Sequence, residues 1–268
     1  MHIHFRMTGR RTEQSGSKAT GIKQTAVSVE PEPNPIIEQL ELAESCSNRK
    51  NATIDLFQAI RGKDLGAFRD ALARHANPNA VDKSNAFRPP VLNLAAERGN
   101  VAMIEELVQS GAILDARDKN DWTALACAVE KGELNATKTL LELGANPNLP
   151  ARGGWTPLML ASMAHGDRQD LAELLLNANA APYETDANGH TALYWAAINN
   201  RMNITQTLLS RRPEPADVEN AFQHCVTENG YTDVAKLLDK HRPSHGEHAP
   251  WYQKIAHRFS GKPAVPVD

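Results

Sequence analysis

The chain has 268 residues, and its 29 basic and 32 acidic side chains give a formal net charge of −3. This near balance does not favour a nucleic-acid-binding surface, which normally carries a basic patch or a high isoelectric point. No apolar run approaches the length of a membrane span, and the first residues lack the apolar core of a secretory signal. The three cysteines, Cys46, Cys127 and Cys225, have no disulfide or metal-ligand spacing. We therefore expect a cytoplasmic protein.

Residues 1–52 are expected to form an N-terminal tail that is mostly disordered. Residues 1–35 are polar and end in the proline-rich run EPEPNP, a composition that cannot bury enough apolar surface to order itself. The prolines favour a semi-rigid spacer, and residues 36–44 are compatible with a short helix. We interpret the tail as a solvated segment, with a targeting or secretion role as the alternative.

One pattern returns along residues 53–241. In its clearest copy, Thr123-Ala124-Leu125 is followed by Ala128, Gly132, the pair Leu140-Leu141 and the closing Gly144-Ala145. The leading leucine advances by 33, 33 and 35 residues along the chain. A single helix pair cannot bury its own apolar face, so at least three such units must stack on one another. The leading leucines are Leu92, Leu125, Leu158 and Leu193.

Helix ends are marked inside each copy. A threonine precedes the first apolar helix in three copies, where its hydroxyl suits an N-cap. Pro157 stands at a first helical position, which needs no backbone donor. Gly111 and Gly144 fall just past a second helix, where a left-handed cap suits glycine. The tripeptides NPN at residues 77–79 and 146–148 predict turns into the following hairpins. The threonines are Thr123, Thr156 and Thr191.

These residues resemble the ankyrin repeat family. The segments WTPLMLASMAHG and LLELGANPN match its turn–helix–helix consensus, and the resemblance covers residues 53–241. It implies an all-α ankyrin-repeat solenoid of about six repeats, degenerate caps included, with projecting hairpin loops and a protein-binding role. The histidine that usually follows the leading leucine is replaced, which suggests helix starts without the family's threonine–histidine bonds. The replacing residues are Asn93, Ala126, Met159 and Tyr194.

Two connections depart from the pattern. The loop between Asn79 and Pro90 is about three residues longer than its sisters, and we expect it to bulge at residues 84–87. The run Arg211-Arg212-Pro213-Glu214-Pro215 replaces the usual closure and should break the regular hairpin.

Residues 242–268 are expected to form a C-terminal tail. His241, His245 and His248 resemble possible metal ligands, but the neighbouring prolines and glycine break any helix that would align them, so we expect no metal site. Trp251 and Phe259 belong to a short amphipathic segment. We interpret this segment as packing on the last repeat, with a partner-docking motif or contact with an anionic membrane as alternatives.

The family resemblance places recognition residues on the hairpin tips and on the exposed side of each first helix. One column, just before the N-cap, holds two of the chain's four tryptophans, Trp122 and Trp155, 33 residues apart. Each is expected either to contact a partner or to pack on the neighbouring hairpin as a staple. Trp195 and Cys127 stand in the column of Leu94 and Leu160 and are expected to pack in the core. The predicted partner-binding residues are Trp122, Trp155, His190, Lys119, Asn120, Arg152, Asn188, Glu130 and Lys131.

The sequence contains no GxSxG, no phosphate-binding glycine loop, no HExxH and no CxxC. We therefore predict a non-enzymatic scaffold or adaptor that needs no cofactor and binds another protein, not a nucleic acid or a small-molecule substrate. One alternative is a bacterial effector or regulatory protein whose tails carry targeting or activity while the repeats act as an address. As an effector, it would be exported to a host cell. The other is a structural helper, such as a chaperone-like cap on one enzyme.

Overall fold

The computed structural model describes residues 35–164, 166–230 and 232–242. By its internal contacts the chain divides into two units, Met1–Leu42 and Ala43–Asp268, and the repeats lie in the second. The described residues form 12 helices and two isolated β-bridges. The helices are α1 (Pro35–Gly62), α2 (Leu65–Ala73), α3 (Val91–Glu97), α4 (Val101–Gln109), α5 (Ala124–Lys131), α6 (Leu134–Glu142), α7 (Pro157–Met163), α8 (Gln169–Asn177), α9 (Ala192–Ile198), α10 (Met202–Leu209), α11 (Pro215–Asn229) and α12 (Asp233–His241).

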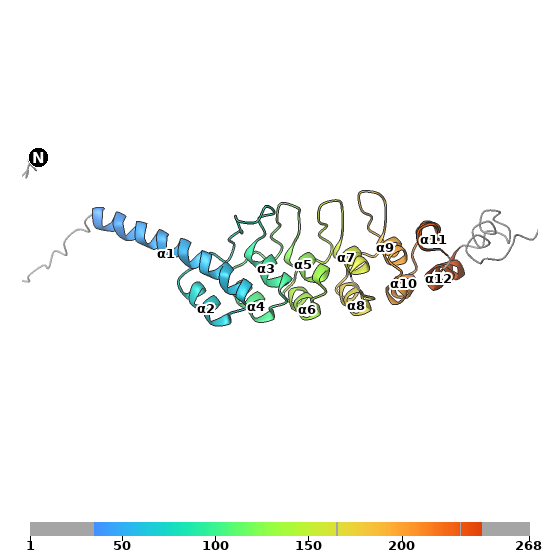
Figure 1. Cartoon of the computed structure of the whole chain (residues 1–268), viewed down its shortest axis with the longest axis horizontal. Coiled ribbons are helices and arrows are strands. Elements are labelled where there is room, and N and C mark those ends of the chain that lie inside the picture. The colour runs from blue at the N-terminus through green and yellow to red at the C-terminus, as the bar shows by residue number, and fades with distance from the viewer. Residues whose placement is uncertain (1–34, 165, 231, 243–268) are drawn as a thin grey trace, which may run out of the picture. The chain divides into compact units, whose positions relative to one another are not determined.

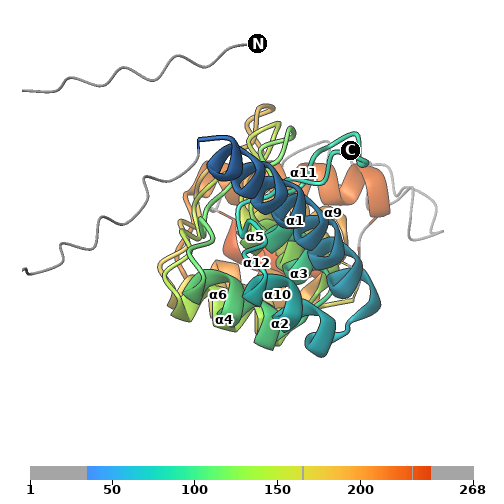
Figure 2. The ribbon, with the colours of Figure 1, turned by 90° about the vertical axis from the view of Figure 1, so that its left-hand side faces the viewer.

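Consecutive helices pair, and the pairs stack along the chain. The first helices α3, α5, α7 and α9 contact one another in that order, and the second helices α4, α6, α8 and α10 do the same. Loops project on one side between the pairs (Figure 1), and a view along the stack shows the helices of each kind one behind another (Figure 2). The predicted all-α ankyrin-repeat architecture is therefore confirmed.

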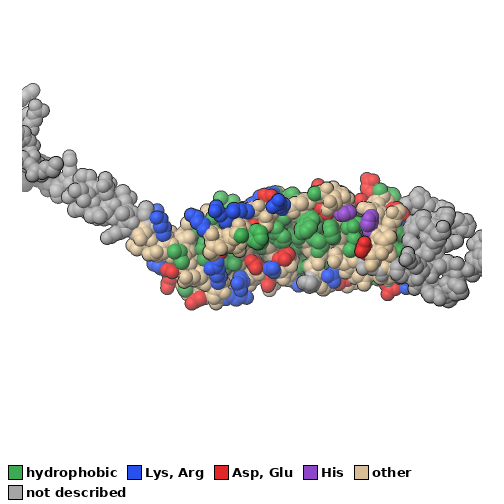
Figure 3. All heavy atoms as spheres, turned by 45° about the horizontal axis from the view of Figure 1, so that its top comes forward, with side chains coloured by type: hydrophobic (Ala, Val, Ile, Leu, Met, Phe, Trp, Pro, Cys, Tyr) green, Lys and Arg blue, Asp and Glu red, His purple; other side chains and the backbone are tan. Residues whose placement is uncertain are grey.

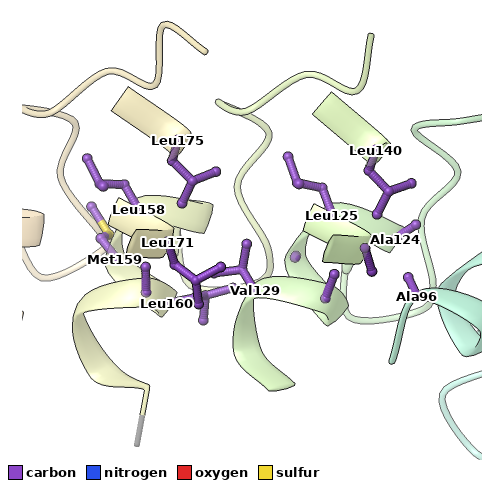
Figure 4. Packing of buried hydrophobic residues seen from close by; sticks show 14 of the residues in the cluster. Ala96, Ala124, Leu125, Val129, Leu140, Leu158, Met159, Leu160, Leu171 and Leu175 are labelled. Atoms are coloured by element: carbon purple, nitrogen blue, oxygen red, sulfur yellow. The ribbon is translucent and has the colours of Figure 1, made fainter. Parts of the chain in front are cut away.

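The core repeats with the sequence. Figure 4 shows Leu140 beside Leu125, and Leu175 beside Leu158 in the same arrangement one repeat further on. Because equivalent side chains occupy equivalent places, each helix pair completes the apolar core of its neighbour. The leading leucines Leu92, Leu125, Leu158 and Leu193 are 1%, 1%, 1% and 3% exposed.

The threonine N-caps are confirmed. In three repeats the threonine Oγ1 accepts a hydrogen bond from the backbone N–H three residues ahead, as N-caps do. At the position where the family has histidine, Asn93 donates its side-chain amide to the backbone oxygen of Trp122 (2.8 Å), and so ties one repeat to the next. The N–H to Oγ1 bonds run from Ala126 to Thr123 (3.2 Å), from Met159 to Thr156 (3.4 Å) and from Tyr194 to Thr191 (3.5 Å).

The closing turns after the second helices are left-handed. Gly111 and Gly144 have φ of 89° and 95°, as predicted. His75 and Asn179 occupy the equivalent place in two other repeats, with φ of 60° and 64°. A left-handed residue with a side chain costs roughly 1–2 kcal/mol. The turn is therefore imposed by the packing of the helices on either side, and glycine only makes it easier.

Each predicted NPN turn also fastens its repeat to the next one. The side-chain oxygens of Asn77 and Asn146 accept from the backbone N–H two residues ahead, both at 2.9 Å. The amides of Asn79 and Asn148 then reach the following repeat. Asn79 accepts from Ile113 N (2.7 Å), and Asn148 accepts from Ala181 N (2.7 Å).

The two ends differ from the inner repeats. α1 is one unbroken helix of 28 residues, so the short helix expected over residues 36–44 is continuous with the first helix of the cap. The tail boundary predicted at residue 53 lies inside this helix, and Leu56 and Ile60 on it are fully buried. At the other end, α10 is joined to α11 by residues 210–214 without a hairpin, as predicted. Residues 1–34 and 243–268, including the predicted amphipathic segment, lie outside the described residues.

Among the described residues, no helix has both the length and the apolar character that crossing a membrane requires.

Candidate interaction surface

The projecting hairpins are held by a recurring aspartate. Asp118 accepts at Oδ1 from the backbone N–H of Asn120 (2.8 Å) and of Trp122 (2.9 Å). Asp186 accepts in the same way from Asn188 (2.8 Å) and His190 (2.9 Å). Side-chain acceptance of this kind organises a turn without strand pairing. These aspartates fix the backbone on which the predicted tryptophan column and tip residues stand.

Burial alone would raise the pKa of Asp186, whose side chain is fully buried. The backbone hydrogen bonds from His190 and Asn188, the nearby imidazole of His190 and the indole N–H of Trp195 outweigh burial, so the pKa lies below its usual value. The carboxylate is therefore charged at neutral pH and stays available as an acceptor.

One backbone hydrogen bond links each hairpin to the next. Each bond joins a tip N–H to a tip carbonyl of the preceding hairpin, so the tips form a cross-linked row. The row brings the predicted Lys119, Asn120 and Arg152 together, with their backbones fixed. The bonds run from Lys119 N to Phe87 O (3.0 Å), from Arg152 N to Asn120 O (2.8 Å) and from Ala187 N to Gly153 O (2.8 Å).

The two tryptophans of the column are half-buried. Trp122 and Trp155 both pack against the apolar core, yet both keep part of their surface in solvent. The ring of Trp155 also meets the edge of Trp195, with centroids 6.3 Å apart and planes at 72°. The rings thus have a packing role and an exposed part, and partner contact at this column stays a prediction.

His190, the third member of the column, belongs to an aromatic cluster. Its ring stacks on Tyr194 with centroids 3.8 Å apart, and Nδ1 lies 3.6 Å from Asp186 Oδ2. Trp195 donates its indole N–H to the same carboxylate oxygen (3.1 Å) and packs against the core, as predicted. His224 on α11 completes the cluster, with its ring centroid 5.2 Å from that of Tyr194. Neither Tyr194 nor His224 was among the predicted partner-binding residues. For Tyr194 the available signal was its place three residues after the N-cap Thr191, which His190 directly precedes.

The remaining predicted residues fall into two places. Lys119, Arg152 and Asn188 are exposed on the hairpin tips. Glu130 and Lys131 lie at the far end of α5 from the tips, and their charged groups pair with each other at 3.0 Å. The hydrogen bond that the Lys131 ammonium donates to Glu130 raises the pKa of Lys131. These two charges satisfy each other, whereas the tip residues are presented to solvent.

Figure 3, with the hairpin side turned forward, shows a band of hydrophobic side chains running along the repeats. Lysine and arginine side chains gather at the end nearer α1, and histidines lie toward α11. The surface is therefore amphipathic along its length, which suits a polypeptide partner better than a uniformly charged polymer.

Within the described residues, no group of three or more His, Cys, Asp or Glu side chains is arranged to hold a metal ion. Burial, together with the carboxylates of Asp118, Glu97 and Glu130, raises the pKa of the half-buried Cys127 thiol. Burial also raises the pKa of Cys225. Both thiols are thus protonated at neutral pH and act as small packing groups, since the thiolate is the reactive form.

Residues 56–151 and 158–248, which make up more than half of the chain, match the family model for ankyrin repeats (3 copies). The chain belongs to the ankyrin repeat family. The resemblance stated from the sequence is thereby confirmed, with its repeat register. Ankyrin repeats generally mediate protein–protein interactions, and the repeat domain itself is non-catalytic.

Several curated proteins share this repeat region. Human SH3 and multiple ankyrin repeat domains protein 2 is 38% identical over 139 residues, which is 52% of this chain and 7% of that protein. Glycerophosphocholine phosphodiesterase gde1 of Schizosaccharomyces pombe is 31% identical over 163 residues, 58% of this chain and 14% of that protein. An ankyrin repeat protein of Rickettsia bellii is 32% identical over 111 residues, 40% of this chain and 32% of that protein. The chain thus spans less than a third of each relative.

Proposed function

We propose that this chain is a non-enzymatic, cofactor-free scaffold or adaptor that captures another protein on its hairpin tips and the exposed side of its first helices. The observation that carries the proposal is the placement of Trp122 and Trp155. They stand one repeat apart, partly exposed, on hairpins that hydrogen bonds fix in a row. Protein interfaces concentrate binding energy on such preorganised tryptophans.

The free energy that a partner would gain by covering these two rings favours this role. A tryptophan buries roughly 150–250 Å² in full, and the core already covers most of Trp122 and Trp155. If about a quarter of each side chain remains exposed, covering it is worth about 1–1.5 kcal/mol per ring at ~25 cal/mol per Å². The two rings together thus reach the size of an interface hot spot, which is about 2 kcal/mol or more. The surrounding tips Lys119, Arg152 and Asn188 would supply the polar rim.

The test replaces both rings in the full chain. Proteins captured by the unmodified chain from its native cell are identified by mass spectrometry, and the capture is repeated with Trp122→Ala/Trp155→Ala. We expect the specific partner to be lost while the helical circular dichroism is retained. A second pair, Trp122→Phe/Trp155→Phe, keeps most of the packing and should retain part of the binding.

Either of two results would overturn the proposal. Unchanged capture by the alanine pair would remove the tryptophans from the interface. Loss of helical signal in the alanine pair, together with full binding by the phenylalanine pair, would assign the rings to stapling the hairpins.

The second candidate is a bacterial effector or regulatory protein in which the segments outside the repeats carry targeting or activity. Its support is the similarity to the Rickettsia bellii protein. Deleting residues 1–34 and residues 243–268 separately discriminates between the two. A scaffold in the cytoplasm keeps its partner without either segment, whereas an effector loses its localisation or its cellular effect with one of them.

A further inference from the structure

A groove of about 790 Å³ lies between α1 and the first side of the first hairpin, residues 79–84. Its volume falls within the range of roughly 300–1,000 Å³ that is usual for ligand sites. On one side it is lined by α1 residues at helical spacing, among them Lys50, Ile54 and Phe57. On the other side it is lined by the backbone segment 79–84, which includes Val81 and Lys83. The groove lies before the first hairpin, away from Trp122 and Trp155, so the inference goes beyond the proposed function.

The extended segment at Val81 that borders this groove has a free backbone edge. Val81 forms an antiparallel bridge with Pro90, framed by hydrogen bonds from Asp82 N to Pro89 O and from Val91 N to Ala80 O, both 2.9 Å. In this kind of pair the bridging residue points its own N–H and C=O away from its partner strand. Within the described part of the chain, neither backbone group of Val81 makes a hydrogen bond.

The free edge follows from the architecture. Every later hairpin has its leading side bonded to the preceding hairpin through the row of tip hydrogen bonds. Before the first hairpin the described chain forms only the helices α1 and α2, so no hairpin of the described chain uses the edge. The position of the missing hairpin is the groove itself.

The floor of the groove is apolar and partly exposed. Ile54 is 56% exposed and Val81 is 38% exposed, and both are large apolar residues. Phe57 is buried between them and the core. An isolated exposed apolar residue is ordinary, but two that face one groove over a buried aromatic ring form a surface that gains from being covered.

The charges around the floor have one sign. Arg49, Lys50 and Lys83 line the groove with exposed basic groups. The carboxylate among the lining residues, Asp82, is buried and already bonded to Arg61 and Ser84. Those bonds outweigh the effect of burial and keep the pKa of Asp82 below its usual value. A ligand in the groove therefore meets uncompensated positive charge.

We propose that this groove binds an extended acidic segment of a partner protein, which adds as a strand along the free edge at Val81. Main-chain hydrogen bonds to that edge would supply affinity, and alternate side chains would supply specificity. Apolar side chains of the segment cover Ile54 and Val81, and its carboxylates meet Lys50 and Lys83. The backbone edge and the apolar floor favour a peptide over a nucleic acid, which offers no amide groups of strand spacing.

The probe is a fluorescein-labelled peptide, EVETEVETE, titrated with the full chain by fluorescence anisotropy. The matched peptides are KVKTKVKTK, which reverses the charge, and EVETEVETE with alternate backbone amides methylated, which blocks strand pairing. We expect the acidic peptide to bind at least about tenfold more tightly than either, and to weaken as salt screens the charges. Equal affinity for the basic peptide overturns the charge assignment, and equal affinity for the methylated peptide overturns strand addition.

Variants of the chain locate the site. Lys50→Glu/Lys83→Glu changes two exposed side chains of the groove, and Lys138→Glu on α6 is the control, since its side chain is 61% exposed and far along the chain. We expect about tenfold weaker binding of the acidic peptide by the double variant and no change with the control. Ile54→Ser, also at an exposed position, should weaken binding without affecting the helical signal. Equal binding by the double variant and the control would place the peptide elsewhere and overturn the proposal.

Discussion

The inner helix pairs and the end pairs of this stack are stabilised by different means. An inner pair such as α5 and α6 has a neighbour on both sides, and it is held by buried leucines and by hydrogen bonds that recur from repeat to repeat. An end pair has one neighbour, so part of its outer face lies in solvent, as the exposed Ile54 does at the N-terminal end. At the C-terminal end the guanidinium of Arg242 lies 4.2 Å from the ring centroid of Phe222 and pairs with Glu219 at 2.6 Å. The repeated leucines therefore form the core of the inner pairs, whereas individual contacts of charged side chains stabilise the C-terminal end.

The largest predicted effect lies in an inner repeat. Leu158→Ala removes a side chain that is 1% exposed, so we expect the free energy of unfolding to fall by about 2–5 kcal/mol. Ile54→Ala at the N-terminal end, where the side chain is 56% exposed, should change it by less than about 0.5 kcal/mol. Urea denaturation followed by circular dichroism measures both. Similar losses for the two variants would mean that the ends carry as much of the core as the middle.

The next effect compares the two ends. The side chain of Arg242 is 12% exposed and forms ion pairs with both Glu219 and Asp239. We therefore expect Arg242→Ala to lower the free energy of unfolding by about 1–3 kcal/mol. Arg74 pairs with Asp55 at 2.8 Å, but the two side chains are 50% and 42% exposed. Arg74→Ala should therefore cost less than about 1 kcal/mol.

Thermal unfolding at low and high salt checks this contrast. The cost of Arg74→Ala should shrink at high salt, because exposed pairs are screened, while that of Arg242→Ala should persist. An equal cost at both ends would contradict the view that the C-terminal end depends on this one side chain.

A smaller effect concerns the turn just before the tryptophan column. Gly154 and Gly189 have φ of 83° and 81°, so alanine at either position is strained by about 1 kcal/mol. At Gly154 a Cβ would also lie 3.0 Å from Ala187 N of the next hairpin, whereas at Gly189 it would meet nothing within 4 Å. We expect Gly154→Ala to be the more destabilising by about 1 kcal/mol or more. Asp121 has a φ of 62° at the same place, so Asp121→Gly should raise the free energy of unfolding by up to about 1 kcal/mol.

Melting temperatures of the three variants rank these effects. If Gly154→Ala and Gly189→Ala were equally destabilised, the close approach of neighbouring hairpins would play no part in stability.

The features that the sequence predicted are those that repeat. The spacing of Leu92, Leu125, Leu158 and Leu193 predicted the stack and its register, because each leucine meets the same environment. The left-handed His75 could not be predicted from its type, since its conformation is imposed by the helices on either side. The continuity of α1 was also missed, because the polar run at residues 45–51 between its two apolar parts is typical of a linker.

The candidate surface was predictable in the same measure. The tryptophan column came from counting 33 residues between Trp122 and Trp155, and the structure places both on linked hairpins. The aromatic cluster was not predicted from the sequence. It joins His190 on a hairpin to His224 on α11, and the connection before α11 has no hairpin, so the repeat pattern gives no register for this contact. The groove at Val81 arises from a hairpin that is missing, which no pattern of present residues can indicate.

The last and smallest effect is the pH dependence of the hairpin that Asp186 holds. Asp186→Asn keeps a side-chain oxygen for the backbone bonds but removes the charge that His190 and Trp195 face, so at pH 7 we expect a loss of about 1 kcal/mol. Because the folded-state pKa of Asp186 lies below the unfolded value near 3.8, its charge stabilises the protein above that value, and the contribution disappears as pH falls through the folded-state pKa. The difference in melting temperature between the original chain and Asp186→Asn should therefore be constant from pH 7 to about pH 5 and then shrink toward zero. A difference that grows on acidification would mean that the charged carboxylate is destabilised rather than stabilised by its neighbours.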